Sequence, residues 1–276
     1  MSARTTLKSG ATQLLKLAAA GRDALPPNRQ GAVVLLYHRV GGASSLAVDL
    51  PTSLFTAQVG ELAGGGRLTS LGSLLDAVSR PDAPAPEPVA ITFDDGTADF
   101  VDVAVPVLAA VGAPATLYVA TDFVDRGRPF PHGGKPLSWA ALRDVMTTGL
   151  VSVGSHTHSH ALLDRLPAAE VASELDRSIK LIEDNLGVTP EDFAYPKALL
   201  GSAAAREAVR ERFRSAAVAG TRPNPYGATD PYRLSRSPVQ VGDGMRWFRH
   251  KARGGMALED DIRQLVNRRR YVGAVT

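Results

Sequence analysis

Two adjacent carboxylates, Asp94 and Asp95, follow a short apolar run that is rich in β-forming residues. The run is Val89–Phe93, and Gly96 comes directly after the carboxylates. This pattern is typical of a buried strand that delivers polar groups at its carboxyl end. Two neighbouring carboxylates that face one cavity repel each other and resist ionising together. The pattern therefore predicts a compensating cation close to the end of this strand.

Three histidines, His156, His158 and His160, follow a second short run about sixty residues later. The alternating run Val151–Ser155 is typical of a strand that leads into a loop or a first helical turn. In a helical turn the i, i+4 pair His156 and His160 lies on one face and can bind a single ion, while His158 points away. One aspartate with two histidines forms an open metal site that leaves positions for water and substrate. Such a site can activate water near neutral pH.

The two motifs together resemble those of the polysaccharide deacetylase family, also known as the NodB-homology or carbohydrate esterase family 4 enzymes. They read Thr-Phe-Asp-Asp-Gly and His-Thr-His-Ser-His in this chain, and the resemblance extends over about residues 32–240. It implies that Asp94 is the general base and that Asp95, His156 and His160 hold the metal. The plain alternatives are a helix cap or turn for Asp94 and a polar surface turn for the histidines.

A third chemical group, His38, follows the continuous apolar run Ala32–Tyr37. That run is typical of a strand buried on both faces, and barrel enzymes place working residues at strand carboxyl ends. We therefore expect His38 to share a cavity with Asp94 and His156. The early Tyr-His pair resembles a subgroup of the family in which this histidine is the catalytic acid. A histidine satisfied by a core hydrogen bond is the alternative.

The third motif of the family departs from its usual form in this chain. The family usually has arginine, any residue, proline and tyrosine, and the arginine orients the base; here Ala194 and Lys197 stand in those places around Tyr195 and Pro196. The salt bridge from that arginine is therefore expected to be missing. The resemblance still implies oxyanion or substrate contacts from Tyr195, Pro196 and Lys197, including the backbone N–H of Lys197.

The late leucine, any residue, histidine motif of the family is also absent. Leu234–Arg236 and Pro238–Gln240 lie roughly where it should be, without a histidine. This absence favours His38 as the substitute acid. Reduced or lost activity is the competing interpretation.

The segments that must position these side chains alternate between apolar runs and helical patterns. The alternation predicts parallel crossovers and a closed or nearly closed barrel, and the resemblance implies an α/β fold of the NodB-homology type, an irregular (β/α) barrel of seven or eight strands. The expected strands are 32–37, 89–93, 115–120, 151–155, 193–196 and 215–219, and the expected helices are 51–63, 71–78, 100–111, 139–146, 167–186 and 203–213.

Length and composition indicate one large domain with flanking segments. We expect an N-terminal amphipathic segment at 1–30, the barrel at 31–244 and a basic helical tail at 245–276. Lys16 interrupts the apolar patch of the first segment, so no secretory signal is predicted and the cytoplasm is the default location. We expect this segment to pack on the barrel, with peripheral membrane contact as the alternative. In the tail, a helix is expected at 258–268, and Trp247 is open to two roles: stacking on a sugar or packing the tail.

The net charge of +3 does not indicate a nucleic-acid partner, and the absence of cysteine excludes disulfides, thiolate zinc sites and cysteine nucleophiles. The predicted function is a metal-dependent hydrolase that removes N-acetyl groups from amino sugars in a glycan or glycan precursor, a carbon–nitrogen bond other than a peptide bond. Asp94 would be the base and a water on the metal the nucleophile. Zinc suits the ligands, with cobalt, manganese, nickel or iron as alternatives. The rival functions are a catalytically impaired carbohydrate-binding protein, or a hydrolase of O-acetyl esters or cyclic amides.

Overall fold

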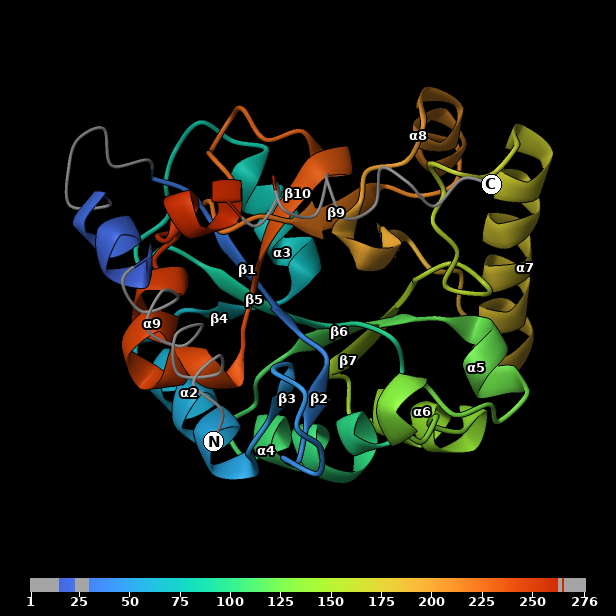
Figure 1. Cartoon of the computed structure of the whole chain (residues 1–276), viewed down its shortest axis with the longest axis horizontal. Coiled ribbons are helices and arrows are strands. Elements are labelled where there is room, and N and C mark those ends of the chain that lie inside the picture. Colours follow the sequence, from blue (N-terminus) through green and yellow to red (C-terminus); the bar gives the residue numbers. More distant parts are fainter. Residues whose placement is uncertain (1–14, 23–29, 263–264, 266–276) are drawn as a thin grey trace, which may run out of the picture.

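The computed structural model describes residues 15–22, 30–262 and 265, which form a parallel β-barrel surrounded by helices (Figure 1). The eight-stranded sheet contains a closed ring of seven strands in the order β1-β10-β9-β8-β7-β6-β5, and pairing of β1 with β5 closes the ring. β4 adds to β5, and β2 and β3 form a separate pair. The strands are β1 (Val33–Tyr37), β2 (Arg39–Val40), β3 (Asp49–Leu50), β4 (Leu68–Thr69), β5 (Val89–Phe93), β6 (Ala115–Val119), β7 (Val151–Ser155), β8 (Asp192–Ala194), β9 (Ser215–Ala219) and β10 (Leu234–Pro238). The predicted NodB-type (β/α) barrel is confirmed.

Helices cover the outside of the barrel, and within the described residues each of them is too short or too polar to span a bilayer. Residues 15–22 and 257–262 are also helical. The α-helices are α2 (Thr52–Gly64), α3 (Leu71–Val78), α4 (Val105–Ala109), α5 (Thr121–Asp125), α6 (Trp139–Met146), α7 (Ala168–Leu186), α8 (Ala203–Arg210) and α9 (Gly244–Lys251). A π-helical turn, η1 (Phe100–Ala104), precedes α4, and the 3-10 turns are η2 (Pro131–Gly133), η3 (Pro196–Ala198), η4 (Pro231–Arg233) and η5 (Val241–Asp243).

The registers of the barrel strands align the candidate residues at one end. Tyr37 of β1 is the partner of Phe93 of β5, so the residues that follow them, His38 and Asp94, emerge side by side. The backbone N–H of Asp94 donates to the carbonyl of Tyr37 at 3.1 Å, which fixes the two strand ends together. The carboxyl ends of parallel barrel strands lie on one face of the barrel, so this register brings His38 and Asp94 together on that face.

One barrel strand, β10, was not predicted from the sequence. Its residues Leu-Ser-Arg-Ser-Pro lack the apolar run that identifies a buried strand, yet four of the five are buried. The polar residues are accommodated because Arg236 points into the barrel, where it meets Thr92 of β5 at 3.3 Å and lies over the Tyr118 ring of β6 at 5.0 Å. Gly154 of β7 leaves room for that ring, since a Cβ there would lie 2.6 Å from it.

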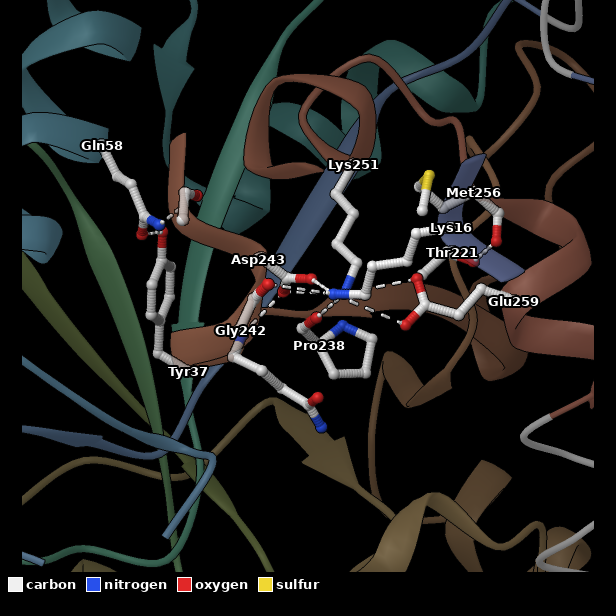
Figure 2. A network of polar contacts seen from close by, with 12 residues as sticks. Lys16, Tyr37, Gln58, Thr221, Pro238, Gly242, Asp243, Lys251, Met256 and Glu259 are labelled. Atoms are coloured by element: carbon white, nitrogen blue, oxygen red, sulfur yellow. Dashed lines mark hydrogen bonds and ion pairs between the residues drawn. The ribbon is translucent and has the colours of Figure 1, made fainter. Parts of the chain in front are cut away.

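The two flanking segments are tied together by a buried ionic cluster, which Figure 2 shows. Asp243 receives the Lys16 ammonium at 2.5 Å and the Lys251 ammonium at 2.8 Å, and all three side chains are at most 2% exposed. Lys251 also donates to the Pro238 carbonyl of β10 at 2.8 Å. The charge that interrupts the N-terminal apolar patch is therefore paired inside the protein, which agrees with packing of this segment on the barrel.

Trp247 packs the tail and is not a sugar platform. It is 3% exposed and clusters with Ala19 and Met256, so its ring joins the N-terminal helical segment to the C-terminal part of the chain. Residues 1–14 and 23–29 of the N-terminal segment lie outside the described residues. So do residues 263–264 and 266–268 of the helix predicted at 258–268, and the whole arginine triplet 268–270. The division into segment, barrel and tail stays a prediction.

Candidate active site

A cavity of about 810 Å³ opens at the carboxyl ends of the strands. Its lining includes His38, Asp94, Asp95, His156 and His160. These residues come from the ends of β1, β5 and β7, three strands of the closed barrel. The structure therefore brings the predicted metal ligands, base and acid into one space.

The two adjacent carboxylates take different directions from the end of β5. Asp95 has a left-handed backbone conformation with φ 78°, and Gly96 follows with φ 104°. The Asp94 side chain is 5% exposed, whereas that of Asp95 is 24% exposed. Left-handed conformations are costly for most residues but are tolerated by aspartate and glycine. This turn separates the charges, so that Asp94 lies toward the barrel interior and Asp95 toward the cavity.

Asp95, His156 and His160 form a cluster whose ligand atoms all lie within 4.8 Å of one another. Asp95 Oδ1 lies 3.8 Å from His156 Nε2 and 3.5 Å from His160 Nε2. Two ligands of a tetrahedral zinc ion, each about 2.0–2.2 Å from it, lie roughly 3.3–3.6 Å apart. The 3.5 Å distance lies in this range and the 3.8 Å distance is slightly longer, so a small inward movement of the donors would accommodate a divalent ion of the zinc type.

Each histidine of this cluster is poised to offer a lone pair. His156 Nδ1 lies 2.7 Å from the Ala194 carbonyl, a bond that requires a proton on Nδ1 and leaves Nε2 as an acceptor. Burial lowers the pKa of His156, and burial together with the neighbouring His156 lowers the pKa of His160 to about 4. Both imidazoles are therefore neutral at pH 7, the form in which they bind metals.

The histidine segment is a loop and not the helical turn considered from the i, i+4 spacing. Thr157 and His160 have positive φ values of 65° and 62°, which a right-handed helix excludes. The rings of His156 and His160 still converge, with centroids 5.0 Å apart. His158 is directed elsewhere: its Nδ1 lies 3.0 Å from Thr121 Oγ1, and it is not part of the cluster.

An arginine does lie beside the base, although it is not the arginine of the third motif. Arg236 of β10 forms a two-pronged ion pair with Asp94, with Nη1 2.6 Å from Oδ1 and Nη2 2.9 Å from Oδ2. Both residues are buried, at 0% and 4% exposure. The arginine comes from a strand 142 residues further along the chain, not from the third motif, where Ala194 stands. The only signal in the sequence was an arginine close to the place of the absent late histidine motif.

The charge balance around Asp94 keeps this carboxylate ionised. Burial acts to raise its pKa, but the Arg236 guanidinium and then His156 outweigh burial and lower the pKa to about 2. Asp94 Oδ2 also lies 3.8 Å from His156 Nε2, so one carboxylate oxygen faces the metal-type cluster. The Asp94 carboxylate is therefore a charged proton acceptor at neutral pH, and two hydrogen bonds fix its orientation beside the cluster.

The remaining predicted residues fall into two groups. His38 is half-buried, and its Nδ1 has no hydrogen-bond partner among the described residues, so a core hydrogen bond at that atom does not account for it. Lys197 lines the cavity and has a positive φ of 54°. The backbone N–H of Tyr195 donates to the Ala217 carbonyl at 3.0 Å; the residue is 1% exposed, and its ring packs on the Phe193 ring. Neither Tyr195 nor Pro196 lines this cavity.

The carboxylate and histidine motifs lie inside the segment 82–214, which matches the sequence model described as "Polysaccharide deacetylase". The chain belongs to the polysaccharide deacetylase family. The YxkH protein of Bacillus subtilis (strain 168) is 29% identical over 164 residues. That alignment covers 59% of this deacetylase-family chain and 55% of YxkH, so the chain matches only about half the length of this curated relative.

Solved structures resemble this family member over most of its barrel. IcaB from Ammonifex degensii superposes with a TM-score of 0.70 at 25% identity, over 80% of this chain and 97% of IcaB. The Streptococcus pyogenes deacetylase PplD, in complex with acetate, gives a TM-score of 0.71 at 21% identity, over 81% of this chain and 99% of PplD. The deacetylase-family match at 82–214 includes neither His38 nor Arg236; the sequence pattern pointed to His38, whereas Arg236 was located by the structure.

Proposed function

We propose that this protein is a metal-dependent hydrolase that removes N-acetyl groups from amino sugars in a glycan or a glycan precursor. The observation that carries the proposal is the cluster of Asp95, His156 and His160 beside the Asp94–Arg236 pair in one cavity. Membership of the polysaccharide deacetylase family supports a glycan substrate. Because the chain matches only about half of the length of YxkH, the activity of the whole protein is part of this proposal.

The metal site would be held by Asp95 Oδ1 and by the Nε2 atoms of His156 and His160. When bound, the ion supplies Lewis-acid polarisation of the acetyl carbonyl and lowers the pKa of water. Zinc fits the donor set, and cobalt, manganese, nickel or iron are alternative occupants. The backbone turn at Asp95 and the Nδ1 contact of His156 orient these donors before any ion arrives.

Asp94 and His38 would move the protons of the hydrolysis. Asp94 Oδ2 accepts the proton of the attacking water, while the two hydrogen bonds from Arg236 hold the carboxylate in place. An amide nitrogen expelled as an anion is a very poor leaving group, so it needs a proton. A ring nitrogen of His38, which lines the same cavity, donates that proton. The Lys197 backbone N–H is the candidate donor to the carbonyl oxygen as negative charge develops there.

The rival functions differ in what supports them. A sugar-binding protein without catalysis is suggested by Ala194 in the third motif and by the absent late histidine motif. Arg236 supplies an arginine beside the base and so answers the first point, whereas the absent late histidine still supports this rival. Hydrolysis of O-acetyl esters or cyclic amides uses the same groups and is separated by a panel of such substrates. Nothing specific in the cavity lining favours either rival over N-deacetylation.

The test is acetate release from N-acetylated amino-sugar oligomers, measured with and without a chelator and alongside metal analysis. We expect one equivalent of metal in the purified protein, loss of both metal and acetate release in His156→Ala, and retention of metal in the matched control His158→Gln. Release that is indifferent to metal removal would refute the mechanism. Metal bound without acetate release from any amide or ester would favour the binding protein.

A further inference from the structure

A second cavity of about 330 Å³ adjoins the candidate active site. Arg233 lines both cavities, so the two cavities meet at this residue. The second cavity lies between α8 and η4, and Tyr195, which does not line the first cavity, lines this one. This shared residue places the second cavity beside the first, where a neighbouring unit of the same oligosaccharide would lie.

The lining of the second cavity carries an excess of positive charge. Three arginines, Arg206, Arg210 and Arg233, face two carboxylates, Glu207 and Asp230. Arg210 is already engaged: its Nη2 lies 3.5 Å from Asp230 Oδ2, and its guanidinium stacks on a tyrosine ring with 4.5 Å to the centroid. Within the described part of the chain, Arg206 and Arg233 form no ion pair or hydrogen bond through their guanidinium groups.

Arg206 is half-buried, so its guanidinium is partly removed from water and lacks a protein counter-ion among the described residues. Tyr195 also lines this cavity. Burial raises the pKa of Tyr195 to about 12, although Arg206 and Arg210 act to lower it, so the hydroxyl remains a donor at pH 7. Guanidinium groups with a neighbouring hydroxyl donor suit carboxylate and phosphate oxygens.

We propose that the second cavity binds an anionic group of the substrate, a carboxylate or a phosphate, carried next to the amino sugar whose acetyl group enters the first cavity. Arg206 and Arg233 are the principal ligands of this group, with Tyr195 as a further donor. This inference rests on the proposed function and narrows its substrate class to acidic glycans or phosphorylated glycan precursors.

The experiment compares three matched substrates that share one N-acetylated hexosamine. The group attached next to this hexosamine is a uronic acid in the first substrate, the neutral methyl ester of that uronic acid in the second and a phosphate in the third. The measured quantity is the ratio of kcat/KM for each anionic substrate to that for the neutral one. We expect a preference of about tenfold or more for an anion in the native protein, as for a charged hydrogen bond, and a smaller preference at high salt. The uronate and phosphate arms identify which anion is recognised.

Arg206→Gln and Arg233→Gln should each lower this ratio toward one, while Arg206→Lys should retain part of it. Arg249→Gln, on the far helix α9 where the arginine pairs with Glu61 at 2.8 Å, is the matched control and should keep the native ratio. A native ratio near one with efficient turnover would overturn the inference and leave the proposed function intact. If no substrate is turned over, calorimetric binding of the same three compounds decides: selective binding of an anion that Arg206→Gln abolishes supports the cavity, and equal or absent binding refutes it.

Discussion

Replacement of Arg236 by methionine tests how the buried charges of the site depend on each other. The substitution preserves much of the side-chain length but leaves Asp94, which is 4% exposed, without its two hydrogen bonds at 2.6 and 2.9 Å. Removing one partner of a buried ion pair costs about 3–5 kcal/mol, because the other charge stays buried without compensation. We therefore expect Arg236→Met to lower the free energy of unfolding by about this amount at pH 7.

The assay is urea unfolding of the metal-free protein, so that no bound ion compensates for the lost guanidinium. Asp94→Asn/Arg236→Met removes both charges, and its loss of stability should be smaller than the sum of the two single losses. The matched control is Arg214→Met. Arg214 also binds an aspartate, Asp192, through two hydrogen bonds of 3.1 and 3.0 Å, but its side chain is 47% exposed. Because this arginine is half-exposed, although Asp192 is buried, Arg214→Met should cost less stability than Arg236→Met.

Turnover provides a second measurement of the same perturbation. If Arg236 orients the Asp94 carboxylate, acetate release should fall about a hundredfold in Arg236→Met, since displacement of a catalytic group by about 1 Å has this effect. The reasoning is refuted if Arg236→Met is as stable as Arg214→Met, or if the losses of the single variants simply add in the double variant.

Three further substitutions test other parts of the structure. His38→Ala should lower kcat for acetate release by about 10²–10⁴-fold while the metal content stays constant, and an unchanged kcat would mean that another group is the acid. Burial acts to raise the pKa of Asp243, but Lys251 and Lys16 lower it below its ordinary value of 3.8, so the ion pairs stabilise the fold fully above about pH 4 and less as the pH falls further. Asp243→Asn should therefore lower the free energy of unfolding at pH 7 and make it depend less on pH in the acid range. An unchanged acid unfolding curve would contradict this. Gly154→Ala should lower the melting temperature, because the new Cβ would lie 2.6 Å from a buried tyrosine ring and from a backbone carbonyl oxygen, and an unchanged melting temperature would show that the strands can separate at no cost.

Much of the barrel could be predicted because most of its strands have a recognisable local sequence pattern. The segments that became β1, β5, β6 and β9 are apolar or rich in small residues and are bounded by glycine, proline or polar residues, so their positions follow from periodicity alone. β10 was missed for the opposite reason: a strand whose inward residue is an arginine has no apolar signature. Its burial becomes favourable only when a carboxylate on another strand neutralises it.

The histidine loop gives the same contrast at smaller scale. The spacing of His156 and His160 indicated that the two rings could meet, and they do, with centroids 5.0 Å apart. Of the two paths left open by the sequence, a loop or a helical turn, the structure has the loop, because the positive φ values of Thr157 and His160 depend on packing that the sequence does not display. More than one backbone conformation can bring the same two side chains together.

The sequence by itself determined the chemistry available: a pair of carboxylates and a group of histidines, each placed by a short motif at the end of a strand. Only the tertiary structure decided which charges face each other. Asp94 and Arg236 are 142 residues apart, and they meet because closure of the barrel places β5 and β10 on either side of β1. Local patterns carry the information for single strands, whereas a contact across a barrel interior depends on the registers of all the strands that close it.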